Sequence, residues 1–89
     1  MAWTIEFHDR ALRDLKRLAR IDAGRIVHFL EARVAAVDDP RSHGAAMQGV
    51  RFDHLWRYRA GDYRIICDIQ DHRLVVLVIS VGHRRDVYR

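Results

Sequence analysis

The chain has 89 residues, with 16 Lys and Arg, 12 Asp and Glu, and one Cys. This length suits one domain over residues 1–89 with a single thin core, and a content of 49% hydrophobic and 31% charged residues excludes intrinsic disorder. The lone Cys67 excludes an internal disulfide framework, and no apolar run reaches the roughly 20 residues of a membrane helix. We therefore expect a cytoplasmic protein with no signal peptide and no membrane contact.

The first half of the chain predicts a strand followed by two helices. Apolar and polar residues alternate over 3–7, as in a strand with one buried face. Asp9 is the expected N-cap of a helix over 9–19, and a second helix is expected over 22–37, ended by Pro40. The connection between the two helices is short, which favours a helical hairpin.

The first helix has two contrasting faces. Its apolar side, expected to be buried, consists of Ala11, Leu12, Leu15, Leu18 and Ala19. Its opposite side carries Arg10, Arg13, Arg17 and Arg20. This arginine stripe is consistent either with an ordinary solvated helix face or with contacts to RNA phosphates, and the sequence alone leaves both open.

The second half of the chain predicts three strands. Residues 41–53 lack a regular period and are expected to be irregular, whereas 54–60, 63–69 and 73–81 have strand character. Gly61-Asp62 is a two-residue turn of the kind that joins antiparallel strands. The predicted order is βααβββ, an α+β domain in which the N-terminal strand and helical hairpin pack on one face of a mainly antiparallel sheet.

The turn at Gly61-Asp62 predicts a register in which Arg59 lies directly opposite Arg64. The face expected beneath the helices then carries Trp56, Tyr58, Tyr63, Ile65, Cys67 and Ile69. The other face carries Arg57, Arg59 and Arg64. Like charges directly opposite one another destabilise a sheet, so this cluster favours an anion site. The alternative is a surface patch neutralised by neighbouring aspartates.

The C-terminal residues follow the last strand and are expected beside the Arg64 end of the sheet. His83 offers an imidazole, a group that can carry a proton in catalysis. Tyr88 offers a ring that can stack on a base. The six histidines are scattered without ligand spacing and Cys67 falls on the core face, so neither a metal nor another cofactor is expected.

Two segments, LWRYRAGDYRIICDI (55–69) and VLVISVGHRRDVYR (76–89), resemble the RelE/ParE toxin superfamily and its RelE-like branch. WTIEFHDRALRDLKRL and MQG fit as well, so the resemblance spans essentially the whole chain. It implies a fold similar to small microbial ribonucleases and the toxin half of a type II toxin–antitoxin pair. Such a toxin would cut mRNA in the ribosomal A site without metal, and its partners would be the ribosome, mRNA and a cognate antitoxin in a hetero-oligomer.

The resemblance also suggests residue roles. Arg64 matches an arginine that stabilises the charged transition state, Arg84 one near the leaving group, and Tyr88 a tyrosine that stacks on the nucleotide. Arg57 occupies a position that is often lysine, and Arg59 with the first-helix arginines would bind RNA or the ribosome. We hypothesise that His83 is the general acid or base.

Two other functions stay open at this point. The first is a ParE-like inhibitor of DNA gyrase that has the same fold and no enzymatic activity. The second is a degenerate toxin kept as a binding module, indicated by Leu55 at a position that is basic in the RelE type. The set of Arg64, His83, Arg84 and Tyr88 favours the endoribonuclease over both.

Overall fold

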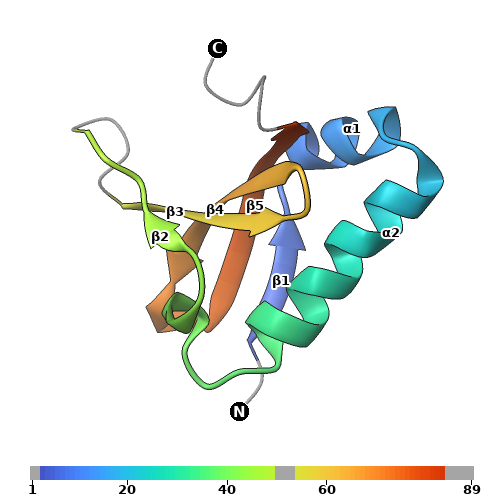
Figure 1. The fold of residues 1–89 in the computed structure, drawn as a ribbon. Helices are drawn as coiled ribbons and strands as arrows, with labels where there is room; N and C mark the ends of the chain where they lie inside the picture. Colours follow the sequence, from blue (N-terminus) through green and yellow to red (C-terminus); the bar gives the residue numbers. More distant parts are fainter. Residues whose placement is uncertain (1–2, 50–53, 84–89) are drawn as a thin grey trace.

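The computed structural model describes residues 3–49 and 54–83 and has the predicted strand–helix–helix–strands order (Figure 1). The strands are β1 (Thr4–Phe7), β2 (Ala45–Ala46), β3 (Leu55–Ala60), β4 (Tyr63–Gln70) and β5 (Val75–His83). The helices are α1 (Asp9–Arg17) and α2 (Arg20–Phe29), and a π-helical turn (Leu30–Ala35) continues α2. Within the described part of the chain, no helix is both long and apolar enough to cross a membrane.

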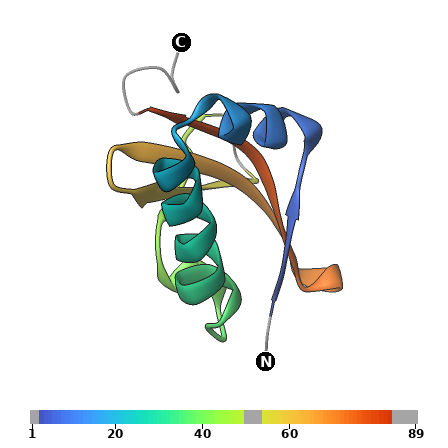
Figure 2. The ribbon, with the colours of Figure 1, turned by 90° about the vertical axis from the view of Figure 1, so that its right-hand side faces the viewer.

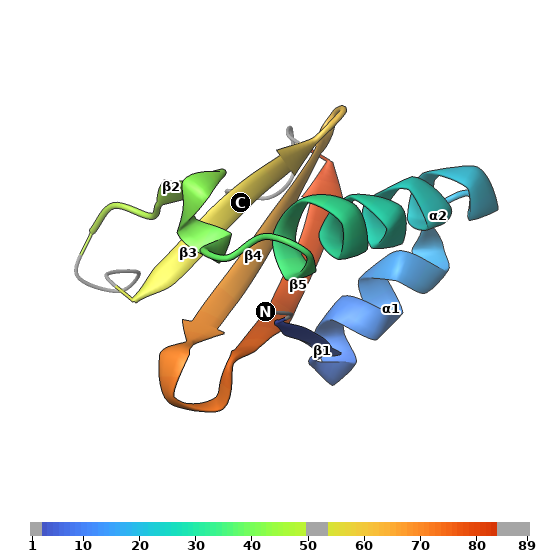
Figure 3. The same ribbon diagram turned by 90° about the horizontal axis from the view of Figure 1, so that it is seen from below.

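The strands form one sheet in the order β1-β5-β4-β3-β2. β1 runs parallel to β5, and every other neighbouring pair is antiparallel, so the predicted mainly antiparallel sheet is confirmed. Both helices lie on the same side of this sheet (Figures 2 and 3). Within residues 3–49 and 54–83 neither α1 nor α2 covers the opposite side, which we call the open face of the sheet.

The core fills the space between the helices and the sheet. Ile26, Leu30 and Val34 contribute fully buried side chains from the helical layer. The sheet contributes Tyr58, Ile65, Cys67, Val76 and Val78, which are also fully buried. The predicted core face of the hairpin therefore does lie beneath the helices, and Cys67 is packed within it.

Both helices begin and end at residues that differ from the prediction. His8, not Asp9, is the N-cap of α1, and its Nδ1 accepts a hydrogen bond of 3.1 Å from the Arg10 amide. The reason is that the His8 amide still donates to the Val78 carbonyl, which keeps His8 extended as the last residue beside β5. α2 begins at Arg20, so the expected 22–37 helix starts earlier and changes to π geometry at Leu30.

The segment after the helices is more ordered than its sequence predicts. Pro40–Ser42 forms a 3₁₀ turn, and β2 pairs with β3 through Ala45 opposite Arg57 and Ala46 opposite Trp56. The Trp56 Nε1 donates to the His43 carbonyl at 2.7 Å, and the Tyr58 hydroxyl donates to the Pro40 carbonyl at 2.6 Å. Side chains of β3 thus tie this segment to the sheet, which the local sequence does not indicate.

Candidate functional site

The β3–β4 hairpin has the register that its two-residue turn predicts. Ala60 lies opposite Tyr63, and Arg59 lies opposite Arg64. Gly61 adopts a φ of +60°, a left-handed conformation that glycine adopts without the strain of a side chain. The predicted pair of like charges, Arg59 opposite Arg64, is therefore present in the fold.

Three arginines share the open face of the sheet. Neighbouring residues of a strand alternate between faces, so burial of Tyr58, Ile65 and Cys67 under the helices directs Arg57, Arg59 and Arg64 to the other side. Arg59 is exposed, whereas Arg57 and Arg64 are half-buried. We call these three residues the arginine face; guanidinium groups on one face of two paired strands are suited to binding an anion.

The third strand places a glycine next to this cluster. Arg64 lies opposite Gly82 of β5, which has no side chain. The register of β4 and β5 shifts between Ile66 and Cys67, a bulge that no local sequence pattern predicts. Despite the shift, Val78 and Val81 both face the core, so Gly82 stays on the side of Arg64.

His83 lies at the expected end of the sheet, but its ring lies on the helical side. Its Cα is in register with Tyr63, and the two rings meet edge-on with centroids 5.7 Å apart and an interplanar angle of 81°. The Tyr63 hydroxyl in turn donates to Asp22 of α2 at 3.3 Å. Opposite residues of an antiparallel pair share a face, so the sheet separates His83 from the side chain of Arg64.

Two expected site residues, Arg84 and Tyr88, lie outside the described residues. Their segment, 84–89, follows directly from His83, the last residue of β5.

The arginine stripe of the first helix is exposed throughout. Arg10, Arg13 and Arg17 lie on α1, and Arg20 is the first residue of α2. The buried side of α1 is narrower than predicted, since Ala11 is fully buried but Leu12 is 42% exposed. α2 does not cover Leu12, because the two helices diverge around an open groove.

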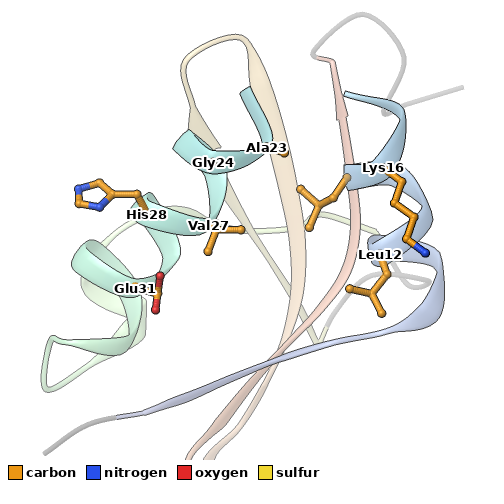
Figure 4. Close-up of a pocket in the computed structure, with 8 residues that line it drawn as sticks. Leu12, Lys16, Ala23, Gly24, Val27, His28 and Glu31 are labelled. Carbon is orange, nitrogen blue, oxygen red and sulfur yellow. The ribbon is translucent and has the colours of Figure 1, made fainter. Parts of the chain in front are cut away.

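That groove is apolar and lies on the helical side of the molecule (Figure 4). It has a volume of about 520 Å³, and Leu12 and Leu15 line it from α1 while Val27 lines it from α2. Lys16 and Glu31 place opposite charges at its rim. The groove and the arginine face are therefore separate surfaces on opposite sides of the sheet.

Sequence reasoning missed Asp14. This half-buried residue of α1 accepts a hydrogen bond of 2.9 Å from the backbone amide of Val81 in β5. The two residues are 67 positions apart, so no local pattern could have signalled the contact. Among the described residues, no three or more His, Cys, Asp or Glu side chains form a group that could hold a metal ion.

Comparison with known proteins agrees with the resemblance in the sequence. Residues 5–88 match the family described as ParE toxin of type II toxin–antitoxin system, parDE. The mRNA interferase toxin RelE of Escherichia coli strain K12 is 29% identical over 84 residues, which cover 94% of this chain and 85% of that protein. Toxin RelG of Mycobacterium tuberculosis is 28% identical over 89 residues, covering 100% of this chain and 99% of the relative.

A solved structure shares the fold over nearly the full length. In the toxin–antitoxin complex RelBE2 of Mycobacterium tuberculosis, one chain superimposes with a TM-score of 0.85 and 26% identity, covering 97% of this chain and 95% of that one. The two helices on a mixed five-stranded sheet are thus the architecture of these toxins. With a family match that leaves out only five residues, the chain belongs to the ParE toxin family of type II toxin–antitoxin systems, within the RelE/ParE superfamily.

Proposed function

We propose that this chain is a toxin that cleaves mRNA in the ribosomal A site, an endoribonuclease that needs no metal ion. The relative from Escherichia coli is named an mRNA interferase toxin, and it aligns with nearly all of this chain. The observation that carries the proposal is the arginine face, with Arg57, Arg59 and Arg64 side by side on two paired strands. Guanidinium groups gathered on one face match the charge and the planar geometry of a phosphodiester.

The proposed reaction uses the RNA itself as the nucleophile. The 2′-hydroxyl loses its proton and attacks the adjacent phosphorus, and the bond from phosphorus to the 5′-oxygen breaks as that oxygen gains a proton. The products are a 2′,3′-cyclic phosphate and a free 5′-hydroxyl. Negative charge accumulates on the non-bridging oxygens in the transition state, and Arg57 and Arg64 would stabilise it there while Arg59 holds the backbone.

The C-terminal segment would complete the site. Arg84 would stabilise the leaving 5′-oxygen, and Tyr88 would stack on a neighbouring base. The contact of His83 with Tyr63 on the helical side argues against the predicted part of His83 in proton transfer, and we propose that its contribution is smaller than that of Arg64. Leu55 supplies no proton acceptor, so electrostatic stabilisation by arginine carries most of the proposed catalysis.

A cognate antitoxin would keep the toxin inactive in a hetero-oligomer. The basis for this proposal is the structure of RelBE2, a toxin–antitoxin complex that shares the fold of this chain. A sequence pI near 10.0 favours a partner with acidic residues, since opposite charges accelerate encounter and select between partners.

The second candidate is inhibition of DNA gyrase without catalysis. It is favoured by the family match itself, because that family is described by the name ParE. In that case the arginine face would serve binding alone, and messages would remain intact in cells that produce the toxin. The endoribonuclease therefore predicts cleaved mRNA, whereas the gyrase inhibitor predicts intact mRNA and damaged DNA.

The test is primer extension on messages translated in the presence of purified protein. Wild-type protein should leave cuts at A-site codons. Arg64→Ala should lose roughly 100- to 1000-fold in single-turnover rate, the usual result of removing one donor from a developing oxyanion. Arg33→Ala, an exposed arginine in the helical layer, is the matched control and should cut like wild type.

His83→Ala belongs in the same experiment, assayed from pH 5.5 to 8.5. We expect a rate loss below about tenfold and an unchanged pH profile, since a general acid or base would contribute about 100-fold or more. A larger loss with one limb of the profile removed would restore His83 as the proton carrier. Intact messages with wild-type protein, together with gyrase-dependent DNA damage, would overturn the endoribonuclease in favour of the second candidate.

A further inference from the structure

The end of β5 extends beyond the strand that pairs with it. β1 accompanies β5 from Val75 to Val78, and the ladder ends where the His8 amide donates to the Val78 carbonyl at 2.8 Å. The chain then turns into α1, while β5 continues for five more residues to His83. On this edge, the last part of β5 depends on α1 in place of a strand.

Asp14 provides the contact that a strand would have made. Its Oδ2 accepts the Val81 amide at 2.9 Å, and α1 lies along the end of β5 (Figure 1). A carboxylate accepting from a backbone amide is stronger than a neutral hydrogen bond. Ala11, one turn before Asp14, is fully buried, so the helix is packed firmly where the carboxylate projects.

The anchored amide lies next to the proposed site. Val81 is opposite Ile65, and the next residue, Gly82, is opposite Arg64. A shift of the strand end would therefore move Gly82 relative to Arg64 of the arginine face.

We propose that Asp14 is a positioning residue for RNA cleavage, which fixes the end of β5 and hence the place of Gly82 opposite Arg64. The inference rests on the proposed endoribonuclease function. Asp14 touches no RNA in this scheme, and it acts only through the backbone of Val81. Its effect should appear in the rate of the bound complex and not in the affinity for the ribosome.

The test compares Asp14→Ala with Asp14→Asn, which keeps an acceptor oxygen in place. We expect Asp14→Ala to lower the single-turnover rate by about tenfold or more at saturating ribosomes, since small misplacements of catalytic groups are costly. Asp14→Asn should stay within about threefold of wild type, because a neutral acceptor still holds the amide. Ribosome affinity should change little in either variant.

A purely structural role would give a different pattern. Arg41→Ala, which breaks the bidentate pair with Asp71 at 2.8–2.9 Å near the other end of the sheet, is the control for general destabilisation. If Asp14→Ala cuts as fast as Arg41→Ala, or if Asp14→Asn is as slow as Asp14→Ala, the proposal is wrong. Should Asp14→Ala fail to fold, Asp14→Glu takes its place, because one added methylene shifts the carboxylate while keeping its charge. Cleavage by Asp14→Glu at the wild-type rate would also overturn the positioning role of Asp14.

Hydrogen exchange separates this inference from the proposed function. The Val81 amide should exchange at least about tenfold faster in Asp14→Ala than in Asp14→Asn, whether or not RNA is cut. Equal exchange rates of the Val81 amide in the two variants would show that Asp14 does not hold this amide. A wild-type protein that never cuts mRNA would refute the endoribonuclease, and the positioning role for cleavage with it, while the exchange rates still report whether Asp14 holds β5.

Discussion

Tyr58 joins the sheet to the segment that follows the helices. Its side chain is fully buried, its ring meets Phe29 edge-on at 6.1 Å, and its hydroxyl donates to the Pro40 carbonyl. A buried hydroxyl without an acceptor would destabilise the fold by about 1–3 kcal/mol, so this bond is what allows a tyrosine in the core. Cys67, on the neighbouring strand, is buried as a small apolar side chain.

These two residues make the fold sensitive to alkaline pH. Burial raises the pKa of the Cys67 thiol and of the Tyr58 phenol above their ordinary values of 9.0 and 10.0. The unfolded chain therefore loses these protons first, so the stability they contribute is complete below about pH 9 and declines as the pH rises above it. We expect the free energy of unfolding, measured with urea, to fall by up to about 1.4 kcal/mol per pH unit between pH 9 and 10.

Cys67→Ala isolates the thiol's share of this decline. The variant is less stable at neutral pH because it leaves a cavity, yet its stability should vary less between pH 9 and 10 than that of wild type. An identical decline in both proteins would show that Cys67 does not titrate on unfolding.

Some residues of the proposed site could be predicted from the sequence, and others could not. Arg57, Arg59 and Arg64 could be grouped from sequence because a two-residue turn fixes the pairing of the strands it joins. The side of the sheet on which His83 lies could not be predicted from sequence, since it depends on the pairing of β5 with β4 across a bulge. Asp14 was equally inaccessible, because its partner is distant in the chain and is a backbone amide that has no sequence signature.

At the scale of elements, β2 shows how tertiary contacts create a strand that its own residues do not predict. Ala45 and Ala46 show no alternation of apolar and polar residues that would predict a strand. They pair with β3 because the chain before them passes close to that strand. Gly44 makes this approach possible with a φ of +78°. A Cβ at this position would overlap the Arg57 carbonyl oxygen and lie 2.7 Å from the Trp56 Nε1.

Gly44→Ala should therefore destabilise the protein by at least about 1 kcal/mol, from left-handed backbone strain and from the close contacts. Gly24→Ala is the opposite case: the glycine is exposed in α2 with nothing within 4 Å of the added atom, and the change should stabilise by about 0.5–1 kcal/mol. Urea denaturation of both variants measures the difference. A stabilising Gly44→Ala would contradict the described path of the chain beside β3.

The same dependence on context explains the helix ends. Periodicity predicted two helices in the right order, and the α+β arrangement followed from it. The start of α1 was displaced by a hydrogen bond to β5. The π-helical turn after α2 ends at Ala35, whose carbonyl accepts a hydrogen bond of 2.9 Å from the Trp3 amide. Local propensity holds no information on either partner.

At the scale of the molecule, positive charge is carried on two separate surfaces. The arginine face lies on the open side of the sheet, and the stripe on α1 lies in the helical layer. A ribosome-bound enzyme needs one surface for the reacting phosphodiester and another for affinity, and phosphate contacts of the second kind require charge without base reading. The stripe is our candidate for that second surface.

Arg13→Glu with Arg17→Glu tests this division. Each reversal removes two charges, so the formal net charge falls from +4 to zero. We expect ribosome binding, measured by sedimentation, to weaken about tenfold or more at low salt and to depend less steeply on salt. Arg25→Glu with Arg33→Glu makes the same change in net charge at exposed positions and should weaken binding less. Equal losses in both pairs would assign the effect to overall charge.

The parallel pairing of β1 with β5 has a consequence for biosynthesis. Thr4 cannot meet Val75 until the last strand has left the exit tunnel of the translating ribosome, so the first strand made waits for the last. Contacts of such long sequence separation form late, because the intervening loop must close first. A nascent copy therefore lacks the pairing of β1 with β5, and with it the complete sheet, for almost the whole of its synthesis.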